Sequence, residues 1–268
     1  MVDMGMVFPV TAPADLIGLV LIYVCAAVMS GLSGFGFSAI GALSLIYLPP
    51  TMAISMLMML SLVTQAWSFS RLWGELRSYS QPWHRPDGVL PYCVGGVIGM
   101  PVGIEIMTMV GPKELMLVFG LLLVLYSGYS LLKPAKSFLS KVASWRSSLL
   151  VGACGGVIGG FTAFPGSVLV IWTALIGASK EHGRALTQPF VFFMQLVGLA
   201  VIAGTRPQIF NGQMLTLFTA MVPLALIGSW VGVAIYRKTS QVDYRNICFA
   251  ALGVSGLGLL LKLGLSSS

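Results

Sequence analysis

The side chains that combine useful chemistry with a place inside the long apolar segments of this sequence are neutral. Glu105 lies two residues from the end of its segment, and His84 and His182 lie in expected loops. A proton relay or a sodium site normally contains buried carboxylates. Neutral donors and unwound backbone N–H groups instead suit an oxyanion. The candidates of this kind are Ser30, Ser33, Ser38, Ser55, Gln65, Thr162, Ser167, Thr187 and Gln195.

Two sharper motifs are weaker candidates. Gly31-Leu32-Ser33-Gly34 has the Gly-x-Ser-Gly form of an intramembrane serine protease, but neither histidine is placed to activate the hydroxyl. A stripe of methionines could bind Cu(I) through thioethers, although flexible apolar packing explains it better in a chain with 15 Met. The four cysteines are scattered singly. The methionine stripe consists of Met52, Met56 and Met59. We therefore expect no catalytic residue, no metal site and no cofactor.

The composition places these residues in a membrane. Of 268 residues, 57% are hydrophobic and 9% are charged, whereas about a quarter of the residues of a soluble protein are charged. A soluble enzyme, a secreted disulfide scaffold and a disordered chain are excluded on this ground. The same reasoning argues against a nucleic-acid partner despite the net charge of +7. We expect an all-α integral membrane protein whose surroundings are the lipid bilayer.

Eight long apolar runs are expected to form the membrane helices. A helix needs about 20 residues to cross about 30 Å of hydrocarbon, and six runs fit this length. The other two, Asp15–Leu48 and Ser148–Gly177, are too long for one crossing and too short for two. Glycine clusters at 31–36 and 155–160 interrupt them, which predicts two broken or re-entrant hairpins and about eight to ten membrane helices in all. The ordinary runs are Thr51–Phe69, Gly88–Met107, Leu115–Leu132, Ala185–Gly204, Met214–Tyr236 and Asn246–Leu263.

The basic residues predict the orientation. If both hairpins return to the side on which they start, four loops fall on one face and hold 12 of the 15 Lys and Arg residues. By the positive-inside rule this face is cytoplasmic, which places both termini outside a bacterial inner membrane. The four loops are Ser70–Asp87, Lys133–Ser147, Ala178–Arg184 and Arg237–Arg245.

The two halves of the sequence resemble each other. Gly31 and Gly34 match Gly156 and Gly159 at an offset of 125 residues, and later positions match at 129. Each half has the same order, a glycine-broken hairpin followed by three spans, and the two halves start on opposite sides. This order predicts inverted repeats, a transporter architecture with its substrate near the midplane. The expected boundaries are a first repeat at 1–134, a basic cytoplasmic linker at 135–147 and a second repeat at 148–268.

Inverted-repeat transporters bind substrate between broken helices, whose N-termini carry positive dipole ends. The two glycine clusters are therefore the expected binding place. Helix packing alone is the competing explanation, because Gly, Ser and Thr let membrane helices approach closely. Arg184 and His182 are expected at the cytoplasmic mouth of the second half, where they would attract an anion or only set the orientation.

The glycine clusters and their flanking motifs resemble the sulfite exporter TauE/SafE family. The resemblance covers nearly the whole chain and includes Pro49-Pro50 with Ala53-Ile54-Ser55 in one half and Arg184-Ala185-Leu186-Thr187 in the other. It implies transport of sulfite, sulfonates or related sulfur oxyanions. The chain departs from the usual triple glycine at Gly34-Phe35-Gly36-Phe37 and at Phe161-Thr162-Ala163-Phe164. These aromatic residues are expected to favour an organic sulfonate.

We therefore predict a transporter, not an enzyme, that exports a small sulfur-containing oxyanion. Ser55 and Thr187 are the expected hydroxyl contacts. The alternatives are a carrier for another small organic anion and a membrane-embedded serine hydrolase using Ser33. The sequence leaves open whether copies of the chain form a homo-oligomer. The predicted substrate-binding residues are Gly31, Ser33, Gly34, Gly36, Ser55, Gly156, Gly159, Gly160, Thr162, Arg184, Thr187 and Gln195.

Overall fold

The computed structural model describes residues 13–132 and 144–267, and these residues contain helices and turns but no strand. Three short 3-10 helices accompany ten α-helices. The α-helices are α1 (Pro13–Ser33), α2 (Phe37–Gly41), α3 (Pro50–Leu76), α4 (Val89–Met109), α5 (Pro112–Leu132), α6 (Trp145–Thr162), α7 (Gly166–Leu175), α8 (Lys180–Thr205), α9 (Gly212–Lys238) and α10 (Gln241–Ser267). The 3-10 helices are η1 (Ala42–Ile46), η2 (Arg77–Tyr79) and η3 (Pro207–Ile209).

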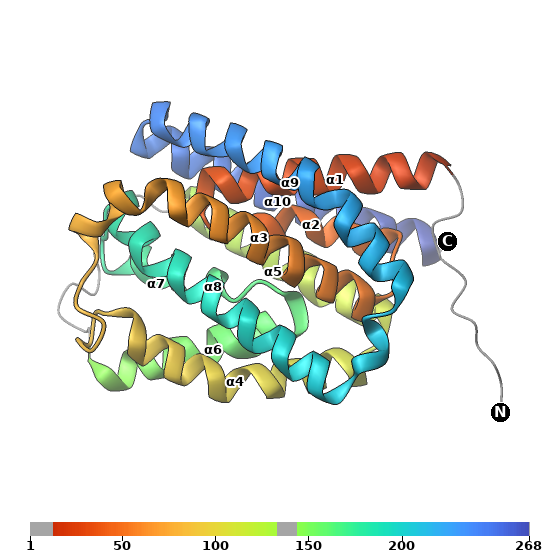
Figure 1. The fold of residues 1–268 in the computed structure, drawn as a ribbon, viewed down its shortest axis with the longest axis horizontal. Helices are drawn as coiled ribbons and strands as arrows, with labels where there is room; N and C mark the ends of the chain where they lie inside the picture. Colours follow the sequence, from red (N-terminus) through yellow and green to blue (C-terminus); the bar gives the residue numbers. More distant parts are fainter. Residues whose placement is uncertain (1–12, 133–143, 268) are drawn as a thin grey trace.

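The helices follow the apolar runs of the sequence. Each ordinary run forms one helix, and each of the two long runs forms a hairpin, α1 with α2 and η1, and α6 with α7. The returning arm α7 has 10 residues and is therefore about 15 Å long, half of the hydrocarbon thickness. Figure 1 shows α7 pointing back toward the end at which α6 begins. The second hairpin is thus re-entrant.

Apart from the two hairpins, the most extensive helix contacts join the first half of the chain to the second. α1 packs on α9, α4 on α6, and α5 on α10, while α3 and α8 pack on each other. α3 also contacts α9, and α8 also contacts α4. In Figure 1 the long helices run along the same axis, with α3 and α8 between the α1–α9 and α4–α6 pairs. The halves are therefore interlocked within one bundle.

The α4–α6 and α1–α9 pairs have glycine at their points of contact. A Cβ atom on Gly103 would lie 2.0 Å from the carbonyl oxygen of Val157, and one on Gly232 would lie 2.0 Å from that of Val28. Such contacts are possible only between bare backbones, as in the small-residue interfaces of membrane helices. Glycines with the same 2.0–2.2 Å approach to a carbonyl oxygen are Gly31, Gly95, Gly99, Gly152 and Gly156.

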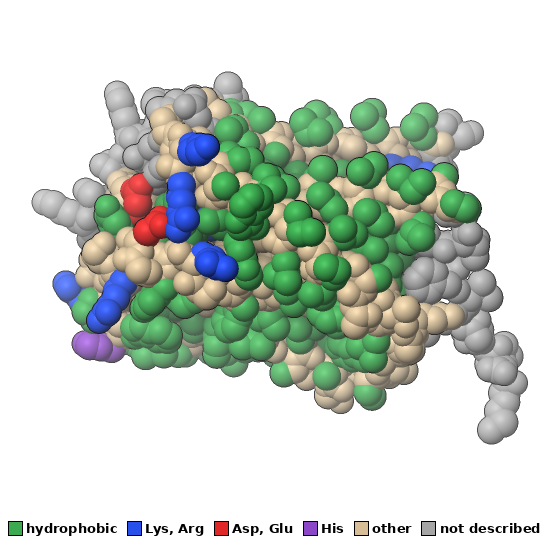
Figure 2. All heavy atoms as spheres, turned by 45° about the horizontal axis from the view of Figure 1, so that its top comes forward, with side chains coloured by type: hydrophobic (Ala, Val, Ile, Leu, Met, Phe, Trp, Pro, Cys, Tyr) green, Lys and Arg blue, Asp and Glu red, His purple; other side chains and the backbone are tan. Residues whose placement is uncertain are grey.

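The outer surface is apolar. Five helices within the described ranges are long and apolar enough to cross a membrane, and large side chains such as Leu125 and Ile98 are more than two-thirds exposed. Figure 2 shows a mostly hydrophobic face whose visible charged side chains lie chiefly at the end where α3 ends and α8 begins. An apolar girdle with one charged end is expected of a chain embedded in lipid.

Two details of the sequence interpretation are wrong. The predicted offset of 125 residues between the glycine clusters misplaces the second break: Gly156 and Gly159 lie inside α6, and the break falls at Ala163, 129 residues after Gly34. The expected loop Ala178–Arg184 is largely helical, because α8 begins at Lys180. Both errors arise where a glycine or a charged residue is taken as a helix end although tertiary contacts continue the helix.

We expect Gly103→Val to destabilise the protein by about 1–3 kcal/mol, the usual cost of overpacking, because the added side chain meets the Val157 carbonyl. Thermal unfolding of the detergent-purified protein measures the loss. Gly128→Val in α5 is the matched control, since a Cβ there has no neighbour within 4 Å. Equal melting temperatures for the two variants would contradict the close packing of α4 on α6.

Candidate functional site

The two helix breaks have the same backbone geometry. α1 ends at Ser33 and is followed by Gly34 with φ 78°, and α6 ends at Thr162 and is followed by Ala163 with φ 56°. Within the described ranges, Ala163 is the one residue other than glycine with a positive φ. An alanine held in the left-handed region costs free energy, so the surrounding contacts must hold this turn in place.

A hydroxyl group caps each break. Ser33 Oγ donates to the carbonyl of Met29 at 2.7 Å and accepts the N–H of Gly36 at 2.8 Å. In the second break Thr162 Oγ1 donates to Ile158 at 2.6 Å and accepts the N–H of Phe164 at 3.1 Å. The hydroxyls of Ser33 and Thr162 therefore stabilise the two turns that follow the broken helices.

Two glutamines from the central helices secure the left-handed residues. Gln65 Nε2 of α3 donates to the carbonyl of Gly34 at 2.5 Å, and Gln195 Nε2 of α8 donates to the carbonyl of Ala163 at 3.0 Å. Ser38 Oγ donates to the same Ala163 carbonyl. Both glutamines are fully buried. Because an unpaired buried carbonyl is costly, these donors stabilise the breaks.

The breaks meet at the centre of the bundle. The rings of Phe35 and Phe164 stack with centroids 6.1 Å apart and planes inclined by 19°. A Cβ atom on Gly166, the first residue of α7, would lie 3.1 Å from Phe35 Cβ and 3.3 Å from Thr187 Cγ2. The start of α7, the first break and one turn of α8 thus converge, and the positive end of the α7 dipole faces this region.

Arg184 is buried beside the first break, with an exposed fraction of 2%. Its Nη1 and Nη2 donate to the carbonyls of Leu32 at 2.6 Å and Gly31 at 2.9 Å. The guanidinium also lies 4.2 Å from the ring centroid of Tyr236. A cation is stabilised at the C-terminus of a helix, where the dipole is negative. The expectation of an arginine in a loop at the mouth is therefore wrong, and the spans contain a buried charge.

Polar and apolar side chains divide the interior along its length. Toward the charged end, Arg184 Nε donates to Gln188 Oε1 at 3.1 Å and Gln188 Nε2 donates to Ser68 Oγ at 2.6 Å. Farther along α8, a Cβ on Gly198 would lie 2.9 Å from Met58 Sδ and 3.4 Å from Met100 Sδ. Polar side chains thus extend from the charged end to the breaks, and methionine side chains pack beyond them.

A protein-family model matches most of the sequence. The model for the sulfite exporter TauE/SafE family matches residues 19–259. The chain therefore belongs to the TauE/SafE sulfite exporter family. The match begins in α1 and ends in α10, so it includes both breaks. TauE/SafE proteins are membrane transporters. Comparisons with curated proteins and with solved structures gave no significant match.

The TauE/SafE fold brings together most of the polar residues predicted from the sequence. Ser33, Thr162, Thr187 and Gln195 lie at or beside the breaks, together with Gly34, Gly36 and Arg184. By contrast, several predicted glycines have packing contacts: Gly31, Gly156 and Gly160 against neighbouring helices, and Gly159 against Pro165.

Ser55 and Thr187 do not form one pair across the centre. α3 and α8 pack on each other with opposite directions, since Gln188 contacts Ser68 and Gln195 contacts Ser61. Thr187 therefore lies opposite the residues near Ser68 of α3, about 15–20 Å along that helix from Ser55. Both hydroxyls are buried, and neither has a hydrogen-bond partner in the described parts of the chain.

Sequence reasoning left Gln65 and Gln188 out of the site. Gln65 stands among the intramembrane polar residues, but its role at Gly34 depends on a contact between residues 31 positions apart. A signal existed: Gln65 and Gln195 are separated by 130 residues, close to the offset of 129 that relates the breaks. Gln188 lies one turn from Arg184 in a helix that begins earlier than expected.

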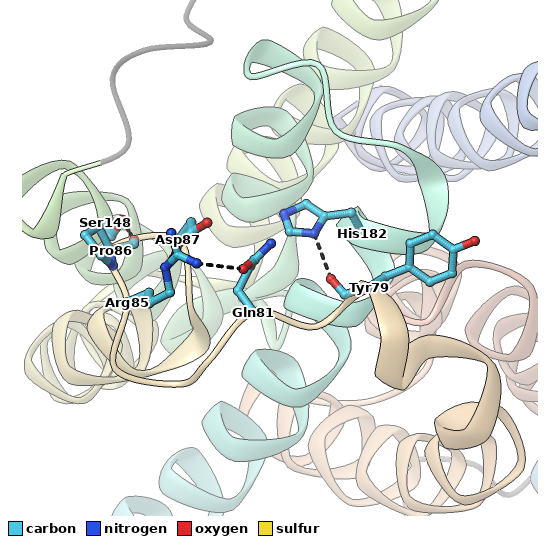
Figure 3. A network of polar contacts seen from close by, with 7 residues as sticks. All are labelled: Tyr79, Gln81, Arg85, Pro86, Asp87, Ser148 and His182. Atoms are coloured by element: carbon cyan, nitrogen blue, oxygen red, sulfur yellow. Dashed lines mark hydrogen bonds and ion pairs between the residues drawn. The ribbon is translucent and has the colours of Figure 1, made fainter.

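A second polar network lies at the charged end of the TauE/SafE chain (Figure 3). His182 Nδ1 lies 2.9 Å from the carbonyl oxygen of Tyr79, Arg85 Nη1 donates to Gln81 at 3.5 Å, and the Arg85 side chain pairs with Asp87 at 3.6 Å. Ser148 Oγ donates to Pro86 at 2.6 Å. These contacts fasten the segment between α3 and α4 to α6 and α8, so His182 has a structural contact at this end.

Replacing Arg184 by Met should lower the free energy of unfolding by at least about 2 kcal/mol, because two buried carbonyls and Gln188 Oε1 lose a donor. Arg184→Lys should recover only part of this loss, since an ammonium lacks the planar fork. Denaturation in detergent compares both variants with Arg77→Met, which removes an exposed arginine. A stability for Arg184→Met equal to that of Arg77→Met would refute the assignment.

Proposed function

We propose that this chain exports a small sulfur-containing oxyanion, sulfite or an organosulfonate, and binds it at the two helix breaks. The observation that carries the proposal is the meeting of two broken helices at the centre of a TauE/SafE bundle. Broken helices supply backbone N–H groups and a positive dipole end to an anion at the membrane midplane. The lining contains hydroxyls, amides and Arg184, which suit an oxyanion.

An inverted-repeat arrangement underlies the proposed mechanism, with repeats at 1–134 and 148–268 joined by a linker at 135–147. The exchange of packing partners supports it, because α4 lies on α6 as α9 lies on α1. The Gly103–Val157 and Gly232–Val28 contacts are related by the same shift of 129 residues as the breaks. In such folds alternating access is a rocking of one group of helices against another around a central site.

The proposed orientation places the charged end in the cytoplasm of a bacterium and both termini outside. The clustering of Lys and Arg at this end supports it through the positive-inside rule. An anion leaving a cell with a negative interior gains about 2.3 kcal/mol per charge per 100 mV. Export can therefore proceed down the electrical gradient, with the polar lining between the charged end and the breaks as the path of entry.

Another small organic anion remains an alternative cargo. The serine-hydrolase alternative is disfavoured by the contacts of Ser33. Its hydroxyl donates to Met29 and accepts from Phe35 and Gly36, so it serves the turn. His84 lies in the segment between α3 and α4, and His182 Nδ1 lies 2.9 Å from the carbonyl oxygen of Tyr79 at the charged end.

Vesicles containing the purified protein should release loaded sulfite faster than protein-free vesicles. With the charged end inside, an imposed inside-negative potential should accelerate the release several-fold, because the field favours exit of an anion. A sulfite-sensitive dye outside the vesicles follows the rate, and protein-free vesicles loaded with sulfite and held at the same potential serve as the control. Slower release under this potential would refute export. Equally fast release from protein-free vesicles loaded with sulfite would refute transport of sulfite.

Thr187→Ala should weaken sulfite binding about tenfold or more, the value of a hydrogen bond to a charged group. It should leave the melting temperature nearly unchanged, because the hydroxyl has no hydrogen-bond partner among the described residues. Ser55→Ala is tested in the same way. Ser127→Ala is the control: it removes a hydrogen bond to Phe249 in the α5–α10 pair, so it should lower stability and spare binding. Titration calorimetry measures the affinity, and unchanged affinity would remove each residue from the site.

A further inference from the structure

The two glutamines that hold the breaks each have one unused acceptor. Gln65 Oε1 and Gln195 Oε1 are buried and make no hydrogen bond with the described residues, although the amide nitrogens of the same side chains are bonded. A buried acceptor without a partner costs free energy and calls for an explanation. That both glutamines have this feature, one at each break, points to a shared ligand.

The orientation of these amides is fixed. Turning either amide over would bring its oxygen against the carbonyl oxygen of Gly34 or Ala163, since an amide oxygen cannot donate. The oxygen and nitrogen of one amide are about 2.3 Å apart. Given the 2.5 and 3.0 Å hydrogen bonds, each free Oε1 lies within about 5 Å of a break carbonyl. Both free oxygens therefore lie beside the breaks, where we propose that the anion binds.

We propose that this pair of acceptors selects anions that carry a hydrogen-bond donor. The inference rests on the proposed function and specifies its substrate class. Hydrogen sulfite, which keeps one proton, and sulfonates with a hydroxyl or ammonium group donate to Gln65 Oε1 or Gln195 Oε1 while their oxyanion accepts from the N–H groups and hydroxyls. A ligand with acceptors alone meets two buried oxygens that repel it.

The discrimination follows from hydrogen bonding and needs no change of net charge. The charged group nearest the first break is Arg184, whose Nε lies 3.1 Å from where a Cβ of Gly34 would be, and it attracts both kinds of monoanion. Sites built to bond a hydroxyl reject analogues that lack it, because the buried groups then stay unpaired. We therefore expect a donor-bearing anion to bind about tenfold more tightly than its matched analogue, or better.

Two matched ligand pairs test this on the wild-type protein in detergent. Isethionate and 1-propanesulfonate differ by a terminal hydroxyl in place of a methyl, and hydrogen sulfite and methanesulfinate differ in the same way. All four are monoanions in mildly acidic buffer. Calorimetric titration should give the first member of each pair at least about tenfold higher affinity. Equal affinities within both pairs would overturn the proposal.

Variants locate the effect. Gln65→Met and Gln195→Met each remove one acceptor, so the preference for isethionate over 1-propanesulfonate should fall in at least one of the two variants and reach near unity when both substitutions are combined. Gln213→Met, in the exposed first turn of α9, should keep the full preference. If both buried variants kept it, the glutamines would not be the selecting groups. A variant that fails to fold leaves the wild-type ligand pairs as the deciding measurement.

The outcomes separate this inference from the proposed function. Binding of both members of each pair with equal affinity leaves sulfur-anion transport in place and overturns the selection by donors. Absence of binding by all four anions overturns the proposed function and, with it, the inference. Binding of isethionate and hydrogen sulfite alone supports both.

Discussion

Interrupting a helix in a membrane exposes backbone carbonyls where no bulk water can bond them, and this constraint organises the interior of the protein. The exposed carbonyls belong to Gly31, Leu32, Gly34 and Ala163, and each accepts from a side chain of another element. Three of these four hydrogen bonds come from α8 and one comes from α3: Arg184 supplies two, while Gln195 and Gln65 supply one each. Hydrogen bonds from the two central helices, α3 and α8, therefore stabilise both broken helices.

The use of side-chain donors to bond these carbonyls also explains how the described interior can be polar although it contains few ionisable groups. Amides satisfy carbonyls without the desolvation cost of a full charge, and here each leaves its oxygen without a partner among the described residues. The one buried arginine described at this site lies against a helix C-terminus and an aromatic ring, where partial negative charge offsets its burial. Polarity is thus concentrated around the breaks and toward one end, while methionines fill the other.

The sequence allowed the helices, the hairpins and the family resemblance to be predicted, because those features depend on the length and hydropathy of continuous segments. It failed where the decisive contact is distant. Gly156 and Gly159 resemble a helix break by composition, yet α6 continues through them because α4 and Pro165 pack closely there. Ala163, which adopts the left-handed turn, has no local signal for it. Arg184 likewise resembles a loop residue until the C-terminus of α1 is placed beside it.

The glycine contacts of the bundle have a mechanical consequence. Where a carbonyl oxygen occupies the position of a missing Cβ atom, as between Gly103 and Val157, two helices cannot slide past each other without collision of their backbones. The α4–α6 and α1–α9 pairs are therefore rigid units, and each contains the first arm of one broken hairpin. A movement that opened the centre would therefore occur at interfaces where side chains, not backbones, are in contact. The α3–α8 interface is of this kind.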